Sequence, residues 1–271
     1  MIYLLITADD FGKDSQTNRA IVIAKEEGVL TSASIMIVGK EWKQAIEMAK
    51  QKDIDVGLHI SITEGSSIAL NKKIRFSPAI LGLLAQFQKK TISWIKEEIS
   101  LQFRRFANTG INFSHVDSHH HIHIHPKLLD IIIKKCQEYS IKSIRFPFEP
   151  WTLSSRISKG HPIRNIFYRW TFYPLSKIFM KKVHLSNIKH PDGVFGLYKT
   201  GEITEDWLLI LLDRLQYIQG VFEIYLHPVD MKNSPGFKEL KALTSHRVAE
   251  KIKDLGIKLI SFSQLPEIIH A

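Results

Sequence analysis

The chain has 271 residues, of which 44% are hydrophobic and 24% are charged, and its formal net charge is +10. This composition is typical of a globular protein and excludes a largely disordered chain. The length fits one large α/β domain, and no apolar run approaches the roughly 18–20 residues that a membrane-spanning helix needs.

Short β-branched runs alternate with longer segments of helical period, which predicts repeated βα units around a parallel sheet. The predicted strands are Tyr3–Thr7, Ser32–Val38, Asp55–Leu58, Phe113–Val116, Ser143–Phe146, Phe222–Leu226 and Lys258–Phe262. The predicted helices are Ser15–Glu27, Trp42–Gln51, Ser93–Asn108, Pro126–Tyr139, Thr204–Leu215 and Ser245–Leu255. Segments near 63–90 and 148–198 interrupt the alternation. We expect a single domain over 1–271 in which these two insertions form walls or lids of an active site.

Polar residues stand at or near the ends of most predicted strands. They are Asp9, Asp10, His59, Asp117, His119, Arg145 and His227. The carboxyl ends of parallel strands meet at one mouth, so we expect these side chains to converge. A lone histidine at a strand end is more often structural, but the joint placement favours a hydrolytic site. One carboxylate and two neutral imidazoles leave open positions on a divalent ion, as metal-assisted hydrolysis requires.

In an extended strand, the side chains of Asp9 and Asp10 would point to opposite faces, so only one of the two carboxylates would face the mouth. A turn into Phe11 and Gly12 could bring both carboxylates toward the mouth. One could then bind metal while the other handles protons.

The segment Asp117–Pro126 contains five histidines. An extended path would put His119, His121, His123 and His125 on one face, whereas a helical path would pair His119 with His123. Such a tract could also be a loose surface chelator. Its position between a strand and a helix that starts with proline favours an active-site role for at least one histidine, and leaves His121 and His123 open as further ligands.

The segment 156–182 is basic and rich in aromatic residues. One interpretation is an amphipathic stretch that makes peripheral membrane contact or meets a lipid-linked substrate; the other is a lid helix whose aromatic face packs on the barrel.

Nucleic-acid recognition motifs are absent, so we expect no nucleic-acid partner. The start of the chain lacks a signal-peptide pattern and there is one cysteine, so we expect a cytoplasmic protein, at the inner membrane face if the segment binds membrane.

Five motifs in this order resemble the YdjC-like carbohydrate deacetylases, the family that contains chitooligosaccharide deacetylase and the hopanoid-biosynthesis-associated deacetylases. The motifs are Thr7–Gly12, Leu30–Ser34, Val56–His59, His115–His123 and Tyr225–Pro228. The resemblance spans nearly the whole chain. Within the family, Thr63–Gly65 and Pro191–Gly196 are more similar to the hopanoid-associated branch.

The resemblance implies a distorted or incomplete (β/α) barrel and a divalent metal, commonly Mg²⁺, held by Asp10, His59 and His119. Zn²⁺ is the alternative, because imidazole ligands intrinsically favour it. Similarity to the more distant NodB-type polysaccharide deacetylases implies that Asp9 is the general base and His227 the general acid. Arg145 would orient Asp9 or contact substrate, and Asp117 would support a histidine ligand.

The expected function is metal-dependent hydrolysis of the N-acetyl group of an acetylated amino sugar. The sugar could be lipid-linked, as in the hopanoid-associated branch, or part of a chitooligosaccharide. Two rivals remain: a metal-dependent phosphoesterase and a non-catalytic protein that binds metal or lipid.

Overall fold

The computed structural model describes residues 1–154 and 162–269 and has a parallel sheet at its centre. Seven strands form this sheet in the path β6-β3-β2-β1-β8-β7, with β9 also beside β1, and every pairing is parallel. The strands are β1 (Ile2–Phe11), β2 (Ser32–Ile35), β3 (Val56–Ile60), β6 (Val116–Ser118), β7 (Gly193–Phe195), β8 (Gly220–Leu226) and β9 (Lys258–Leu259).

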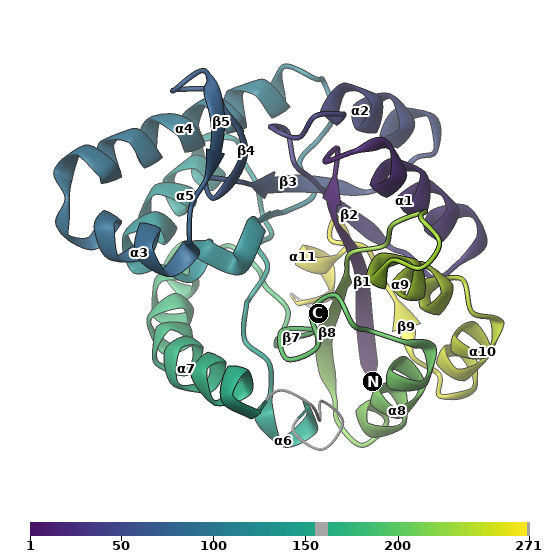
Figure 1. The fold of residues 1–271 in the computed structure, drawn as a ribbon. Helices are drawn as coiled ribbons and strands as arrows, with labels where there is room; N and C mark the ends of the chain where they lie inside the picture. The colour runs from purple at the N-terminus through teal and green to yellow at the C-terminus, as the bar shows by residue number, and fades with distance from the viewer. Residues whose placement is uncertain (155–161, 270–271) are drawn as a thin grey trace.

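Helices surround this sheet on its outer side (Figure 1). They are α1 (Ser15–Glu27), α2 (Trp42–Gln51), α3 (Pro78–Phe87), α4 (Lys89–Ala107), α5 (Pro126–Glu138), α6 (Trp151–Ser154), α7 (Pro162–His184), α8 (Glu205–Leu215), α9 (Pro235–Leu243), α10 (His246–Asp254) and α11 (Leu265–Ile268). Local chemistry starts several of them: Asp14 and Thr204 each accept a hydrogen bond from a backbone N–H in the first turn of α1 and α8.

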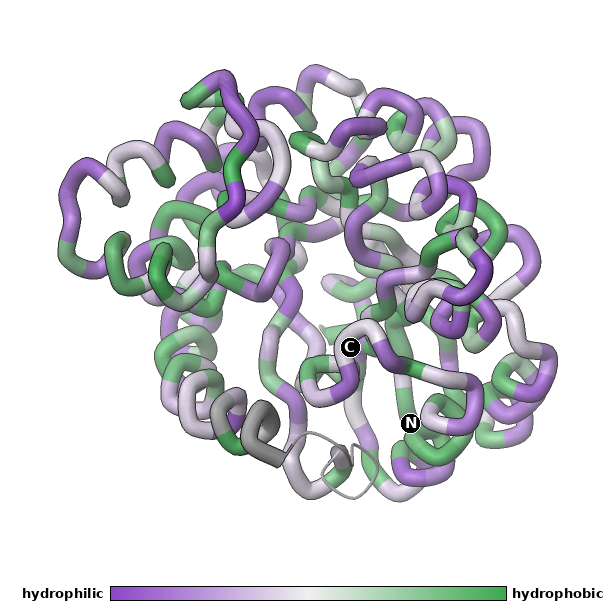
Figure 2. Tube along the Cα trace, in the orientation of Figure 1, coloured by the Kyte–Doolittle hydropathy of each residue, from purple (hydrophilic) through white to green (hydrophobic). Residues whose placement is uncertain are grey.

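The core lies between the sheet and the helices. Nine of the ten residues of β1 are buried, and its apolar run reads as a strand covered on both faces. Figure 2 shows hydrophobic colouring along the central strands and on parts of the helices, with hydrophilic colouring on other parts of the helices and in the loops. One large apolar cluster extends from β1 and β3 to α4, α5 and α8.

The barrel is open between β6 and β7, which confirms the expected incomplete (β/α) barrel. The strand predicted at Ser143–Phe146 lies in this opening but joins its neighbours only through isolated bridges, from Ile144 to Val116 and from Ser143 to Lys189. The prediction of a ladder strand there is therefore wrong. A short apolar run indicates an extended buried segment, but it does not say whether partners lie close enough on both sides.

Other boundaries differ because short strands give a weak periodic signal. The strand predicted at Phe113–Val116 begins three residues later as β6, and the last predicted strand is reduced to the two residues of β9. The sequence did not indicate β7 or α9. Helices α1 and α2 have the predicted bounds.

The two long segments contain ordered elements that sequence periodicity missed. Residues 63–90 hold an antiparallel hairpin, β4 (Glu64–Ser67) with β5 (Lys72–Arg75), followed by α3. Residues 148–198 hold α6, α7 and β7. Whether these segments act as lids stays a prediction.

Only part of the basic aromatic segment 156–182 can be located, because positions 155–161, including Arg156 and Lys159, lie outside the described residues. Along α7, Phe179 is fully buried in the core while Trp170 is 77% exposed. The helix thus packs on the barrel and also presents aromatic surface to solvent. Among the described residues, no helix combines the length and apolarity that crossing a membrane requires.

Candidate metal and catalytic site

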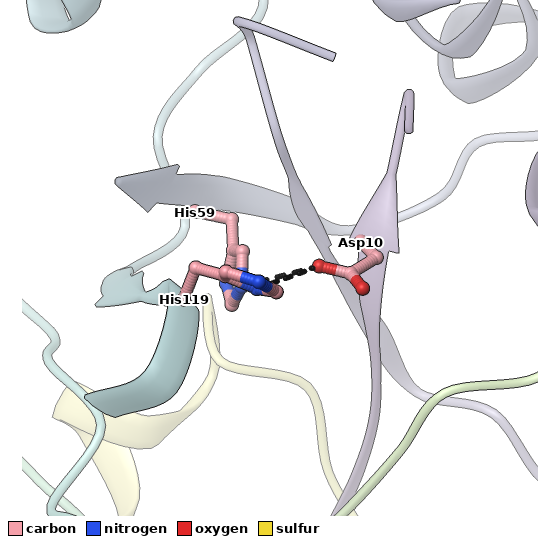
Figure 3. A group of neighbouring side chains, drawn as sticks. All are labelled: Asp10, His59 and His119. Carbon is pink, nitrogen blue, oxygen red and sulfur yellow. Dashed lines mark ion pairs between the residues drawn. The ribbon is translucent and has the colours of Figure 1, made fainter. Parts of the chain in front are cut away.

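Three ligand-type side chains converge at the carboxyl edge of the sheet. Asp10 comes from β1, His59 from β3 and His119 from the turn after β6, and all three are buried. The Asp10 Oδ1 atom lies 3.1 Å from Nδ1 of His119 and 3.6 Å from Nε2 of His59. Figure 3 shows the two imidazoles directed at the carboxylate. One ligand atom from each residue lies within 4.8 Å of the others, so the three can share one metal ion.

A distortion at the end of β1 brings both aspartates to this edge. The pairing of β1 with β2 shifts register between Ala8 and Phe11, and Asp10 has a left-handed backbone with φ +66°. A β-bulge re-aims side chains, and non-glycine residues at positive φ are often found at functional sites. Asp9 and Asp10 therefore both line the same pocket, which a regular strand would not allow.

In each of the three side chains, the polar atom that faces away from the centre of the cluster contacts a charged residue. Lys13 Nζ lies 2.9 Å from Asp10 Oδ2, Asp117 Oδ1 lies 2.8 Å from His59 Nδ1, and Glu64 Oε2 lies 3.2 Å from His119 Nε2. A carboxylate on one ring nitrogen fixes the tautomer and leaves the other nitrogen free as a ligand. These contacts direct His59 Nε2 and His119 Nδ1 toward the centre.

The electrostatics of the cluster keep its carboxylate ionised. Burial opposes the charge of Asp10, but His119 and Lys13 outweigh it and hold the pKa of Asp10 well below its usual value. Burial likewise opposes protonation of His119, yet Asp10 and Glu64 raise its pKa to about 9. A divalent cation between these groups would take the place of that proton.

Two buried atoms at the centre fit a metal ion. Asp10 Oδ1 and His59 Nε2 are buried, and apart from the contacts within the cluster neither has a hydrogen-bond partner among the described residues. Buried polar atoms normally have a partner. Their convergence with His119 supplies one oxygen and two nitrogen donors, a set suited to a divalent cation with open positions for substrate.

Asp9 belongs to a buried ion network next to this cluster. Both of its carboxylate oxygens accept hydrogen bonds of 2.7 Å from the Arg145 guanidinium. Arg145 also contacts Asp117 Oδ2 at 2.6 Å and Glu223 Oε1 at 2.7 Å. It is fully buried, so the geometry favours the role of orienting Asp9 over that of contacting substrate.

The network places three carboxyl groups around one guanidinium. Burial raises the pKa of Glu223 to about 7, with Arg145 opposing the shift and the nearby charges of Asp9 and Asp117 adding to it. The same carboxylates hold the pKa of Arg145 well above its ordinary value, against the effect of burial. Through Arg145, Glu223 links the middle of β8 to Asp9 on β1.

The histidine tract follows neither path considered from the sequence. It forms a 3₁₀ turn, His119–Ile124, that is broken by left-handed residues at His120 (φ +56°) and His121 (φ +53°). His119 enters the metal cluster, whereas His123 turns into the core, where it contacts Ser118 Oγ at 2.6 Å. Among the described residues, neither His121 nor His123 joins a group that could hold a metal.

The cluster opens into a pocket of about 360 Å³. His227, at the end of β8, lines it, and its Nδ1 atom is buried with no hydrogen-bond partner among the described residues. Tyr225 forms one wall; its hydroxyl lies 2.6 Å from Thr200 Oγ1, and its ring lies 5.0 Å from the Arg145 guanidinium. The pocket is thus polar and faces both the metal cluster and Asp9.

Comparison with known proteins identifies the family. Residues 3–254 match the YdjC-like protein family. The chain belongs to the YdjC-like family. Among curated relatives, a carbohydrate deacetylase of Brevibacillus brevis is 29% identical over 97% of this chain and 99% of its own length. A carbohydrate deacetylase of Vibrio campbellii is 25% identical over 97% of this chain and 96% of its own.

Solved structures share the YdjC-like fold at lower identity. A protein of Enterococcus faecalis V583, named for cellobiose-phosphate cleavage, superposes with a TM-score of 0.71 at 22% identity, covering 97% of this chain and 98% of the other. The Xyl-CE4 domain of a multidomain xylanase from the hindgut metagenome of Trinervitermes trinervoides has a TM-score of 0.50 at 11% identity, covering 99% and 91%. At these identities the likeness concerns the fold alone.

Sequence reasoning missed several residues of this YdjC-like site. Lys13 and Glu64 hold ligand side chains, Glu223 joins the Arg145 network, and Tyr225 lines the pocket. Glu223 and Tyr225 lie in a strand that was predicted, and a charged residue inside a buried strand is an available signal. Glu64 lies in the Thr63–Gly65 motif, but the motif did not indicate its contact with His119, which depends on how the β4–β5 hairpin folds.

Proposed function

We propose that this chain is a metal-dependent carbohydrate deacetylase that hydrolyses the N-acetyl group of an acetylated amino sugar. The observation that carries the proposal is the convergence of Asp10, His59 and His119 beside a carboxylate, Asp9, that is held by Arg145. The family and the names of the curated relatives support the activity.

The residues of this chain divide the chemistry between two sides of the pocket. Asp10, His59 and His119 would hold a divalent ion, which when bound polarises the acetyl carbonyl and lowers the pKa of water. Asp9 takes the proton of the attacking water, and Arg145 keeps its carboxylate fixed and facing the pocket. His227, which directly follows β8, gives a proton to the leaving amine.

The donor set bears on which metal binds. Two imidazole nitrogens and one carboxylate oxygen intrinsically favour Zn²⁺, while the resemblance to the family favours Mg²⁺. We propose Mg²⁺ as the working ion and Zn²⁺ as the alternative. Titration of the metal-free protein with each ion, followed by activity at matched occupancy, decides between them.

The substrate is an N-acetylated amino sugar, either in a soluble oligosaccharide or on a lipid carrier. Contact of α7 with a membrane, and a cytoplasmic location at the inner membrane face, are part of the proposal for a lipid carrier. The exposed Trp170 on α7 is compatible with such contact. Sedimentation with anionic vesicles tests it directly.

Acetate release from N-acetylglucosamine oligomers, measured with added metal, tests the activity. Asp9→Asn should retain metal but lose roughly two to four orders of magnitude in kcat, the usual contribution of a general base. His59→Ala should lose both metal and activity. Full activity in Asp9→Asn would refute the base assignment, and release of phosphate from phosphate esters without release of acetate would favour the phosphoesterase.

A further inference from the structure

A second hollow lies between α3 and α7 and continues from the active-site pocket. It has a volume of about 700 Å³, which is within the usual range for small-molecule sites. The two helices lie next to each other on one side of the barrel (Figure 1). His120, His121 and Tyr168 line both spaces, so the groove adjoins the pocket that holds Asp10, His59 and His119.

The lining of the groove differs from that of the active-site pocket. Among the described residues it contains no Asp, Glu, Lys or Arg. Its apolar members are Pro78, Ala79, Gly82, Leu83, Ile122, Ile124, Pro126, Phe172 and Leu175. Its polar members are Ser77, Gln86, His120, His121, His125, Tyr168 and Thr171, so apolar residues make up the larger part of the lining. Sugars have hydroxyl groups that need polar partners, whereas a saturated or prenyl chain does not.

We propose that this groove binds the hydrocarbon portion of an amphiphilic substrate while its N-acetylated sugar occupies the metal cluster. The proposal rests on the proposed deacetylase function and narrows its substrate class to glycosides with an apolar aglycone. His121 stands at the junction of the two spaces, and its buried Nδ1 has no partner among the described residues. It is placed to hydrogen-bond where the sugar meets the chain.

Alkyl glycosides below their critical micelle concentration provide the test, because they present a chain without a membrane surface. We expect kcat/KM for octyl N-acetylglucosaminide to exceed that for the methyl glycoside by at least about tenfold, since each fully buried methylene contributes roughly fourfold. Equal values for the two glycosides would overturn the proposal.

Two matched substitutions on α3 separate the groove from general surface effects. Leu83 lines the groove and is 62% exposed, whereas Ile80 lies outside the groove lining and is 61% exposed. Leu83→Glu should abolish the preference for the octyl glycoside while leaving turnover of the methyl glycoside unchanged. Ile80→Glu should change neither. Equal loss in both variants would contradict a specific groove.

Substitution of Gly82, which lines the groove, can place a side chain inside it. A Cβ atom there would meet only the His125 ring, at 3.6 Å, which is ordinary contact. Gly82→Ala should therefore behave like the parent. Gly82→Leu should block the chain, with a circular-dichroism melt confirming that the variant folds. Retention of the octyl preference in Gly82→Leu would count against the proposal.

A binding measurement keeps the groove distinct from the proposed activity. Octyl glucoside has no acetyl group, and its binding to the metal-free protein can be followed by calorimetry. We expect binding by the parent and by Ile80→Glu, and at least tenfold weaker binding by Leu83→Glu. If this pattern of binding is seen but no glycoside releases acetate, the deacetylase function is refuted while binding of a hydrocarbon chain in the groove is supported. Equal binding by all three proteins would refute binding in the groove.

Discussion

Replacement of Arg145 by methionine would leave three buried carboxyl groups without their common cation. Asp9, Asp117 and Glu223 are each 1% exposed or less, and Arg145 contacts all of them within 2.7 Å. Removing one partner of a buried ion pair typically costs about 3–5 kcal/mol of stability. For a chain of this length that corresponds to a fall in Tm of roughly 10 °C.

The loss should depend on pH in a defined direction. Without Arg145, no guanidinium offsets the burial of Glu223, so its folded-state pKa lies further above its unfolded value; the resulting penalty is absent at low pH and grows as pH rises from the unfolded value toward the folded one. Glu223 already has a pKa of about 7 with the guanidinium present. The stability difference between parent and Arg145→Met should therefore be larger at pH 8 than at pH 5.

Urea unfolding followed by circular dichroism at the two pH values measures this difference. Arg19→Met is the matched control, because Arg19 is paired with Asp230 at the surface and such pairs contribute less than about 1 kcal/mol. Adding Glu223→Gln to Arg145→Met should restore part of the stability at pH 8. A loss of unfolding free energy below about 1 kcal/mol at pH 8 would refute the electrostatic account. So would a larger loss that does not change with pH, because Arg145 would then stabilise the fold through packing alone.

Three further perturbations test other parts of the structure. Glu64→Ala removes the carboxylate that holds His119 Nε2 and should weaken metal binding about 10- to 100-fold, measured by calorimetry, with little change in stability. Burial raises the pKa of Glu149 from 4.5 to about 7, so its ionisation destabilises the fold as pH rises through that interval. Glu149→Gln should match the parent at pH 5 and be more stable at pH 8 by up to about 3 kcal/mol in urea unfolding. Gly57→Ala would place a Cβ atom 2.4 Å from the His115 ring, so Tm should fall by several degrees.

Each of these three has an outcome that contradicts it. Unchanged metal affinity in Glu64→Ala would mean that His119 is oriented without that contact. A constant difference between Glu149→Gln and the parent across pH would mean that the carboxyl stays in one protonation state. A normal Tm in Gly57→Ala would show that both the His115 ring and the His115 carbonyl oxygen, which would lie 2.5 Å from the added Cβ atom, can move aside.

The sequence by itself determined the class of fold and the edge at which the site lies. Alternating strand and helix periods give a parallel sheet, and parallel strands bring their carboxyl ends together. Asp10 and His59 lie near the carboxyl ends of β1 and β3, and the structure places their ligand atoms 3.6 Å apart. The helix signals at α1 and α2 were complete because caps and amphipathic periods are local.

Only the tertiary structure decided how the side chains of the site are aimed. The bulge in β1 turns Asp9 and Asp10 to one pocket, and left-handed residues at His120 and His121 send His119 alone into the cluster. Both depend on a few dihedral angles set by surrounding packing, which no periodic pattern encodes. The contact of Glu64 with His119, the network around Arg145 and the groove between α3 and α7 join residues distant in sequence. They arise only when the chain folds and brings these segments together, because a short segment's own pattern carries no information about its partners.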